Sequence, residues 1–366
     1  MHFTFTYIPH HIEKLQEFLD FLFFEVWLKA DGEFDVDKLE GHKELQQIYL
    51  DLGNTEGKWA QFFNSSIEKI YREFLELDGE FRQFIYQGYI NNNNIKGLCE
   101  DKSLLPITYV EIALEHENLA TELKSFYSKL YGANSPFNLE IFGFLNKGLI
   151  SDYDRKFMDS NNKQVCPFCA LVHLKGNNHS YREAYDHYVP KGSYPFNVLN
   201  FKNLAPMCNE CNSTYKLKVS PICDIDPLMI GAARSLAFYP YSDNHPNLKF
   251  EIELKSSRIN SLTPNDIEVH ISADEGFEEE IYTWLRVFGI KERYKATLCS
   301  PNDGKVWFNS VLEEFENAKE QSDITQQEVY YNAVLKEATK YPLSNKGFLK
   351  SKFLEECKSK GLFDSL

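Results

Sequence analysis

Two Cys-x-x-Cys pairs lie near the middle of the chain, Cys166 with Cys169 and Cys208 with Cys211. Each pair places two thiolates on one tight turn, from which both can reach a tetrahedral ion at about 2.3 Å. The turns are separated by 38 residues, which fits a structural zinc site with four cysteine ligands. A thioredoxin-like redox motif expects a single pair beside a βαβ unit, and neither condition holds. The sequence therefore predicts structural Zn²⁺.

A second set of chemically active residues lies between the two cysteine pairs and just after the second pair. Asp186 and His187 are adjacent between the two pairs, and Asn212 follows the last cysteine directly. Hydrolysis of a phosphodiester needs a base that deprotonates water and a cation that stabilises charge on the phosphate and the leaving oxygen. Carboxylate, amide and imidazole groups are suited to these two tasks. The residue types therefore predict a second, hard-cation site beside a base.

Three segments carry a family resemblance: Tyr185 to Lys191, Asn203 to Cys208, and Cys211-Asn212 followed by Lys216. Their sequences resemble the motif of the HNH endonuclease family, the ββα-metal nucleases, in the subgroup whose hairpin is braced by zinc between two Cys-x-x-Cys turns. The resemblance covers about 50 residues, from Cys166 to Lys216. The Asp-His pair, the Asn-Leu-x-Pro-x-Cys step and the Cys-Asn ending occur in the family's order.

The resemblance implies a role for four residues. His187 is expected to be the general base that activates water, and Asp186 and Asn212 are expected to hold a catalytic Mg²⁺ or Mn²⁺ ion. Asn203 matches the middle Asn of the motif, which holds the hairpin loop and orients the base. The third motif position is Asn212 where the family name has His. Asn is a known ligand variant there, so the departure concerns only the choice of divalent ion.

The charge distribution bears on nucleic-acid binding. The chain carries a net charge of −15, yet residues 161–220 hold 7 Lys and Arg against 3 Asp and Glu, a local balance of +4. Lys191, Lys216 and Lys218 lie in this window and are candidate phosphate contacts, although each alone is equally consistent with a solvated surface charge. A local basic patch is enough to engage phosphates. The acidic remainder favours a nuclease that depends on a partner or a presented substrate.

The rest of the chain is predicted to frame this core. With 366 residues, 43% of them apolar, the chain suggests two or three domains with a sizeable interior. We predict an α+β protein: a helical domain at 1–160 that regulates or docks, the nuclease core at 161–222, and a mostly helical α+β domain at 223–366 with a short hairpin or sheet. Alternating apolar residues predict strands near 250–254 and 267–271. Apolar residues at three-to-four spacing predict helices near 12–26, 59–89, 110–131, 139–145, 278–288, 306–319, 326–339 and 346–358.

The size and flanking regions resemble HNH effectors of prokaryotic defence systems, including those paired with an ATPase partner, such as the Septu type. This resemblance implies DNA cleavage in antiviral defence and a protein partner. The start of the chain has no basic region ahead of an apolar stretch, and no apolar run approaches the roughly 20 residues of a membrane span. We therefore expect a cytoplasmic protein. Two alternatives stay open: a non-catalytic zinc module that binds nucleic acid or protein, and an RNA-cleaving nuclease.

Overall fold

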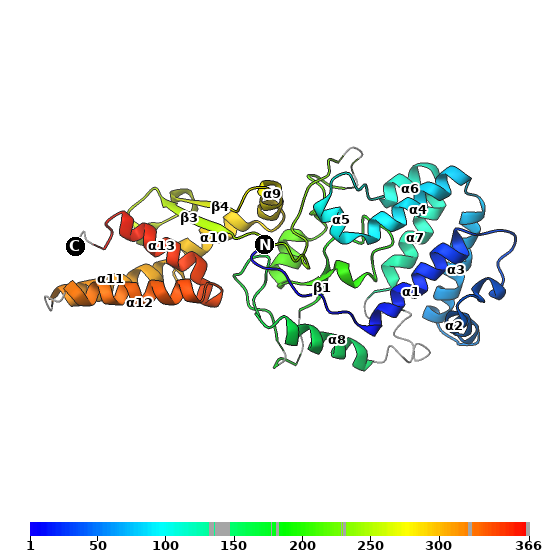
Figure 1. The fold of residues 1–366 in the computed structure, drawn as a ribbon, viewed down its shortest axis with the longest axis horizontal. Coiled ribbons are helices and arrows are strands. Elements are labelled where there is room, and N and C mark those ends of the chain that lie inside the picture. Colours follow the sequence, from blue (N-terminus) through cyan, green and yellow to red (C-terminus); the bar gives the residue numbers. More distant parts are fainter. Residues whose placement is uncertain are drawn as a thin grey trace. The chain divides into compact units, whose positions relative to one another are not determined.

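The computed structural model describes residues 1–131, 135, 147–176, 178–180, 183–227, 229, 232–320 and 324–363. This part of the chain is mostly helical and contains two small sheets of two strands each, in agreement with the α+β class. It forms two compact units (Figure 1). The larger unit consists of Thr4–Gln164 and Leu174–Asp243, and the smaller unit consists of Met1–Phe3, Val165–His173 and Asn244–Leu366. The division into three domains stays a prediction.

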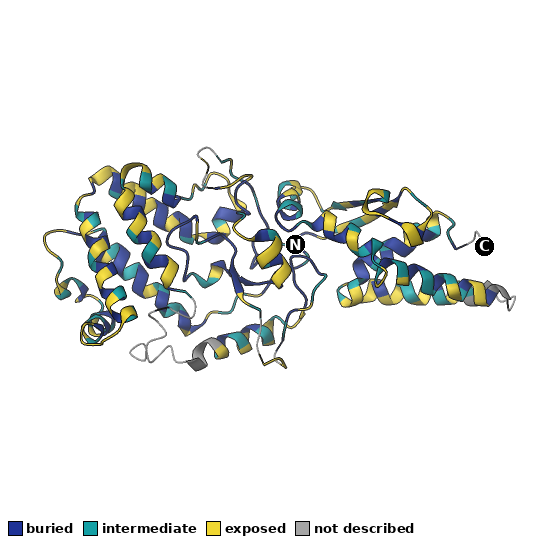
Figure 2. Cartoon of the chain, turned by 180° about the vertical axis from the view of Figure 1, so that it is seen from behind, coloured by how far each residue is buried: buried dark blue, intermediate teal, exposed yellow. Residues whose placement is uncertain are grey.

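Most helices of the larger unit surround one apolar core. Aromatic and aliphatic side chains from α1, α3, α4 and α7 form a single buried cluster, which also takes in Phe196, Val198 and Leu199 from the second half of the chain. In Figure 2 the buried colour lies on the inner sides of these helices. The bounds of the helices are α1 Lys14–Phe21, α2 Lys43–Gly53, α3 Lys58–Leu75, α4 Gly79–Asn93, α5 Ile95–Glu100, α6 Tyr109–Glu115, α7 Glu117–Lys129 and α8 Lys147–Ser160.

Two helices that the sequence predicts as continuous are each broken in the structure. The stretch 59–89 divides into α3 and α4, because the Asp78 side chain caps α4 by accepting a hydrogen bond from the Phe81 amide at 2.8 Å. The stretch 110–131 divides at His116, whose φ of −134° is not helical. The polar break expected at 91–94 begins only at Asn94, since α4 extends to Asn93. The predicted helix at 139–145 lies outside the described residues.

The larger unit also contains the first sheet. Strand β1 (Tyr185–His187) pairs antiparallel with β2 (Leu204–Pro206), so that Asp186 lies opposite Ala205 and His187 opposite Leu204. All residues of both strands are buried. The chain then passes through the second cysteine turn into a short helical segment, Cys211–Lys216. The structure therefore places the segments of the sequence motif on two short paired strands followed by a helical turn.

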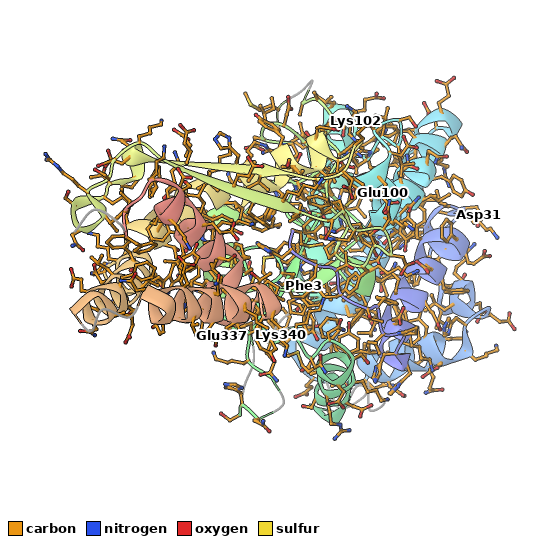
Figure 3. All side chains as sticks on the ribbon, turned by 60° about the vertical axis from the view of Figure 1, so that its left-hand side comes forward. Phe3, Asp31, Glu100, Lys102, Glu337 and Lys340 are labelled. Carbon is orange, nitrogen blue, oxygen red and sulfur yellow. The ribbon has the colours of Figure 1, made fainter. Side chains whose placement is uncertain are left out.

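The smaller unit confirms the two predicted strands. Strands β3 (Lys249–Leu254) and β4 (Ile267–Ser272) pair antiparallel along their full length, with Ile252 opposite Val269. Helix α13 lies against β3, and α11 and α12 pack beside it. Glu337 and Lys340, labelled in Figure 3, are exposed on α12, whereas its Tyr331 and Ala338 are buried. The helices are α9 Glu278–Val287, α10 Ile290–Cys299, α11 Gly304–Glu320, α12 Ile324–Lys340 and α13 Gly347–Ser359. Among the described residues, no helix has the length and apolarity that crossing a bilayer requires.

Candidate metal centre and base

The four cysteines that the sequence pairs into two turns come together in the structure. The sulfur atoms of Cys166, Cys169, Cys208 and Cys211 all lie within 4.8 Å of one another, and all four residues are buried. Four sulfurs at about 2.3 Å from a tetrahedral ion would be separated by roughly 3.8 Å, so the cluster has the dimensions of a zinc site. The predicted grouping is confirmed, and the donor set fits Zn²⁺.

Backbone amides support the thiolates within each turn. The Leu171 N–H points to Cys169 Sγ at 3.4 Å, and the Cys211 N–H points to Cys208 Sγ at 3.5 Å. An amide donor favours the charged form of a thiol, which is the form that binds metal. The first turn closes through Ala170, which takes the left-handed conformation (φ 54°) and donates its N–H to the Cys166 carbonyl. The turns are therefore shaped for ligation by local hydrogen bonds.

Side chains of the smaller unit hold the first cysteine turn. The Trp284 indole N–H donates to the Phe168 carbonyl at 2.6 Å, and the Tyr294 hydroxyl donates to the Cys169 carbonyl at 3.0 Å. The Phe168 ring stacks on Phe288 with ring centroids 4.8 Å apart. These contacts explain why residues 165–173 belong to the smaller unit. The spacing of the cysteines gave no indication of these partners, because they lie more than 100 residues further along the chain.

His187 is held at the end of β1 with a defined tautomer. Its side chain is largely buried, and Nε2 lies 2.8 Å from the Val198 carbonyl oxygen. A carbonyl can only accept a hydrogen bond, so Nε2 carries the proton and Nδ1 is left as the basic nitrogen. Burial lowers the pKa of His187 to about 3, and the positive charge of Lys191 acts in the same direction. The imidazole is therefore neutral at physiological pH.

The loop that supplies the Val198 carbonyl is anchored in the helical core. Phe196 is fully buried, and its ring lies 4.9 Å from that of Tyr89, 5.3 Å from that of Phe23 and 5.5 Å from that of Tyr127. Its backbone takes a left-handed conformation (φ 78°), which costs a bulky residue free energy and persists only where packing enforces it. The aromatic pocket in the helices therefore fixes the backbone two residues before the carbonyl that orients His187.

Asn203 closes the base of the same loop. Its fully buried side chain accepts a hydrogen bond from the Val189 N–H at 2.8 Å and donates one to the Val189 carbonyl at 2.9 Å. Its own carbonyl accepts from the Tyr188 N–H at 2.8 Å. The side-chain amide of Asn203 thus forms hydrogen bonds with both the N–H and the carbonyl of Val189, which lies just after the end of β1. Asn203 therefore ties its own segment to Val189, and the role that the resemblance implies for it in orienting the base stays a prediction.

Asp186 has a buried counter-ion, Lys216. Lys216 Nζ lies 2.7 Å from Asp186 Oδ2 and donates to the His187 carbonyl at 3.0 Å. Burial raises the pKa of Asp186, and the positive charge of Lys216 opposes that shift. The sequence predicts Lys216 as a candidate phosphate contact, whereas the structure buries its side chain to 1% exposure. A buried ammonium needs a partner in this way, and the pair ties β1 to the end of the helical segment Cys211–Lys216.

The remaining predicted residues are less deeply buried than His187, Asp186 and Lys216. Asn212 is half-buried as the second residue of the helical segment, and its N–H donates to the Cys208 carbonyl at 3.0 Å. Lys218 is exposed. Lys191 is half-buried, with Nζ 4.7 Å from the centre of the Tyr131 ring. Burial lowers the pKa of Lys191, and the negative charge of Asp186 acts against that shift.

Sequence reasoning missed Tyr131. Its ring lies edge-on to the His187 imidazole, with ring centroids 4.8 Å apart. The residue lies just beyond the end of α7, 56 positions before His187, and in the sequence it is one more aromatic residue in a helical pattern. Local spacing holds no signal that separates it from the residues of the helical core.

Comparison with known proteins gives one partial match. The chain is 31% identical over 106 residues to the Septu protein PtuB of Bacillus thuringiensis, a stretch that is 28% of this chain. The match spans 38% of the length of that relative. No family model matches the chain, and no solved structure matches it. The chain is thus related over part of its length to a Septu protein, the type of system that its sequence resembles.

Proposed function

We propose that this protein is a metal-dependent endonuclease of the HNH type, with His187 as the general base and Asp186 and Asn212 as ligands of a divalent cation. The observation that carries the proposal is the neutral His187 imidazole, which the Val198 carbonyl fixes on the same strand that carries Asp186. It is held on a two-stranded hairpin that continues into a four-cysteine cluster and a helical turn. A base, a hard oxygen ligand and a metal-braced frame are the parts that the ββα-metal architecture requires.

The tautomer of His187 suits it to accept a proton from water. Because Val198 accepts the Nε2 hydrogen, Nδ1 carries the lone pair. Burial keeps the ring neutral before the reaction, and the carbonyl hydrogen bond fixes the plane of the ring. When Nδ1 takes the proton of a water molecule, the positive charge that develops on the ring is stabilised by the Val198 carbonyl dipole.

The oxygen donors of Asp186 and Asn212 are of the type that suits a hard cation. Lys216 engages Oδ2 of Asp186, which leaves Oδ1 available as a ligand, and Asn212 offers a neutral amide oxygen from the adjoining helical segment. Two protein ligands leave further positions for water and phosphate, as Mg²⁺ and Mn²⁺ prefer. When bound, the cation supplies charge stabilisation at the phosphate and the leaving oxygen. The Lys216 ammonium lowers the negative charge of the site, which favours a cation that is bound together with the substrate phosphate.

The substrate that we propose is DNA. The window 161–220 is the basic part of an acidic chain, and exposed Lys218 and half-buried Lys191 are the lysines of the motif that can meet phosphate. Phosphate contacts of this kind are not sequence specific. We further propose, from the partial relation to PtuB, that the protein is a cytoplasmic effector of antiviral defence with a protein partner, such as an ATPase.

The decisive experiment incubates the purified chain with plasmid DNA, single-stranded DNA and RNA, under Mg²⁺, Mn²⁺ or chelator. We expect metal-dependent cutting of DNA by the wild type and a loss of about 10³-fold or more in His187→Ala, because the general base is removed. His270→Ala is a matched control, since His270 is an exposed histidine on β4 of the smaller unit. It is expected to cut as the wild type does.

Two measurements separate the alternatives. If His187→Ala retains its zinc and its fold but loses cutting, the histidine acts in catalysis. Equal behaviour of His187→Ala and wild type in cleavage would instead favour a non-catalytic zinc module. If the protein cuts RNA in preference to DNA, it is an RNA-cleaving nuclease that uses the same residues. This outcome is chemically consistent, because attack by an activated water does not itself select the sugar.

A further inference from the structure

One aromatic side chain from outside the hairpin contacts two functional groups of the candidate site. The Tyr131 ring meets the His187 imidazole edge-on at 4.8 Å and presents its face to the Lys191 ammonium at 4.7 Å. The ring follows α7 (Glu117–Lys129) in the helical part of the larger unit, whereas His187 ends β1 and Lys191 begins the loop after it. A residue of the helical part is thus wedged between the candidate base and a cation.

The face of the Tyr131 ring stabilises the Lys191 ammonium, which is partly removed from water. The lysine is half-buried, so its ammonium has lost part of its hydration. The negative face of an aromatic ring stabilises a cation within about 6 Å, and most strongly where water is excluded. Asp186 adds a favourable charge. The ammonium is therefore kept beside the base and the cation ligand, rather than extending into bulk water as an ordinary surface lysine does.

We propose that Tyr131 is a positioning residue that holds the Lys191 ammonium beside His187, where Lys191 stabilises the negative charge that develops on the scissile phosphate. This inference rests on the proposed nuclease function and deepens it. A surface lysine that only gathers DNA contributes equally to bound substrate and transition state. A cation fixed beside the base acts where charge develops, so its removal lowers kcat more than it raises KM.

The test compares Tyr131→Phe, Tyr131→Leu and Lys191→Met in steady-state cleavage of DNA by the full chain. The Tyr131→Phe variant keeps the ring, and its kcat is expected to lie within about two-fold of the wild-type value. The Tyr131→Leu variant lacks the ring, and its kcat is expected to be about ten-fold lower than that of the wild type, with little change in KM. The double variant Tyr131→Leu/Lys191→Met should be no slower than Lys191→Met, because the ring acts through the lysine. If Tyr131→Leu does not fold, Tyr131→Met replaces it as a flexible side chain without a ring.

A second readout does not depend on activity. The ring current of Tyr131 should shift the ε-methylene proton resonance of Lys191 upfield, and this shift should be lost in Tyr131→Leu and kept in Tyr131→Phe. Tyr341→Leu is the matched control, because it removes another lysine–tyrosine pair, that of Lys340 at 5.1 Å, from the smaller unit. Its cleavage rate should equal that of the wild type.

The outcomes distinguish the inference from the function on which it rests. Absence of cleavage by the wild type overturns the proposed function and the inference with it. An active wild type and an inactive His187→Ala, together with an unaffected Tyr131→Leu, overturn the inference alone. The inference is also overturned if the decreases in kcat caused by Tyr131→Leu and Lys191→Met multiply in the double variant. It is equally overturned if Tyr131→Phe is as slow as Tyr131→Leu.

Discussion

Lys216 Nζ lies 2.7 Å from Asp186 Oδ2, and both side chains are almost completely buried. The pair connects the middle of β1 to the last residue of the helical segment that follows the second cysteine turn. A lysine that the sequence offers as a contact for external phosphate therefore neutralises an internal carboxylate. The relationship makes Lys216 part of the frame of the candidate site, and its removal has a definite consequence for stability.

Lys216→Met is expected to lower the free energy of unfolding by about 3–5 kcal/mol, because it leaves a buried carboxylate without its partner. Urea denaturation at neutral pH measures this. The matched control is Lys218→Met, an exposed lysine two residues away, with an expected change within about 0.5 kcal/mol. Adding Asp186→Asn to Lys216→Met should restore part of the loss. Equal stability of Lys216→Met and wild type would contradict the buried pair.

Metal removal is expected to unfold the region around the cysteine turns. Structural zinc contributes roughly 10–16 kcal/mol to the folding of small zinc-binding units, and all four thiols of the cluster are buried. Cys208→Ser, or treatment with a strong chelator, should open residues 165–216 to hydrogen exchange. Cys299→Ser, at a half-buried cysteine outside the cluster, should have no such effect. Freshly purified protein without zinc would count against the site.

Phe196→Ala is expected to destabilise the protein by about 3–5 kcal/mol through loss of a buried ring. It is also expected to slow cleavage, since the Val198 carbonyl is released from the position in which it holds His187. Thermal unfolding and steady-state kinetics measure the two effects. Phe84→Ala, at an exposed phenylalanine of α4, serves as the control, with little change expected in either quantity. A destabilised Phe196→Ala that keeps full activity would show that the loop does not orient the base.

The smaller unit offers a prediction for acid pH. Lys255 and Lys295 lie 2.7 and 2.9 Å from the Glu268 carboxylate and lower its pKa from 4.5 to about 2. A lowered carboxyl pKa stabilises the folded state above pH 4.5, and this contribution disappears as the pH falls through 2. Glu268→Gln should therefore be less stable than the wild type at pH 7 and converge with it only below about pH 2. Exposed Glu275→Gln should track the wild type at every pH, and a pKa of Glu268 near 4.5 by NMR titration would refute the pairing.

Some features were predictable because their causes are local. Two cysteines three positions apart form one turn whatever surrounds them, so each two-sulfur turn of the cluster follows from local spacing. The alternation of Phe250, Ile252 and Leu254 predicts a strand, and β3 pairs with β4 as expected. The predicted helix at 59–89 shows the limit of such patterns. Its apolar spacing continues across the cap at Asp78, so periodicity does not reveal that α3 ends and α4 begins there.

The sequence by itself determined which chemical groups are available: four thiols at zinc spacing, an imidazole next to a carboxylate, and lysines around them. Only the tertiary structure decided what each group faces. It paired Lys216 with Asp186 across 30 positions, fixed the His187 tautomer through Val198, and brought Tyr131 to the site from the helical part. Spacing along the chain specifies turns and faces of helices, whereas burial and the partner of a charge depend on contacts between distant segments, which local pattern does not encode.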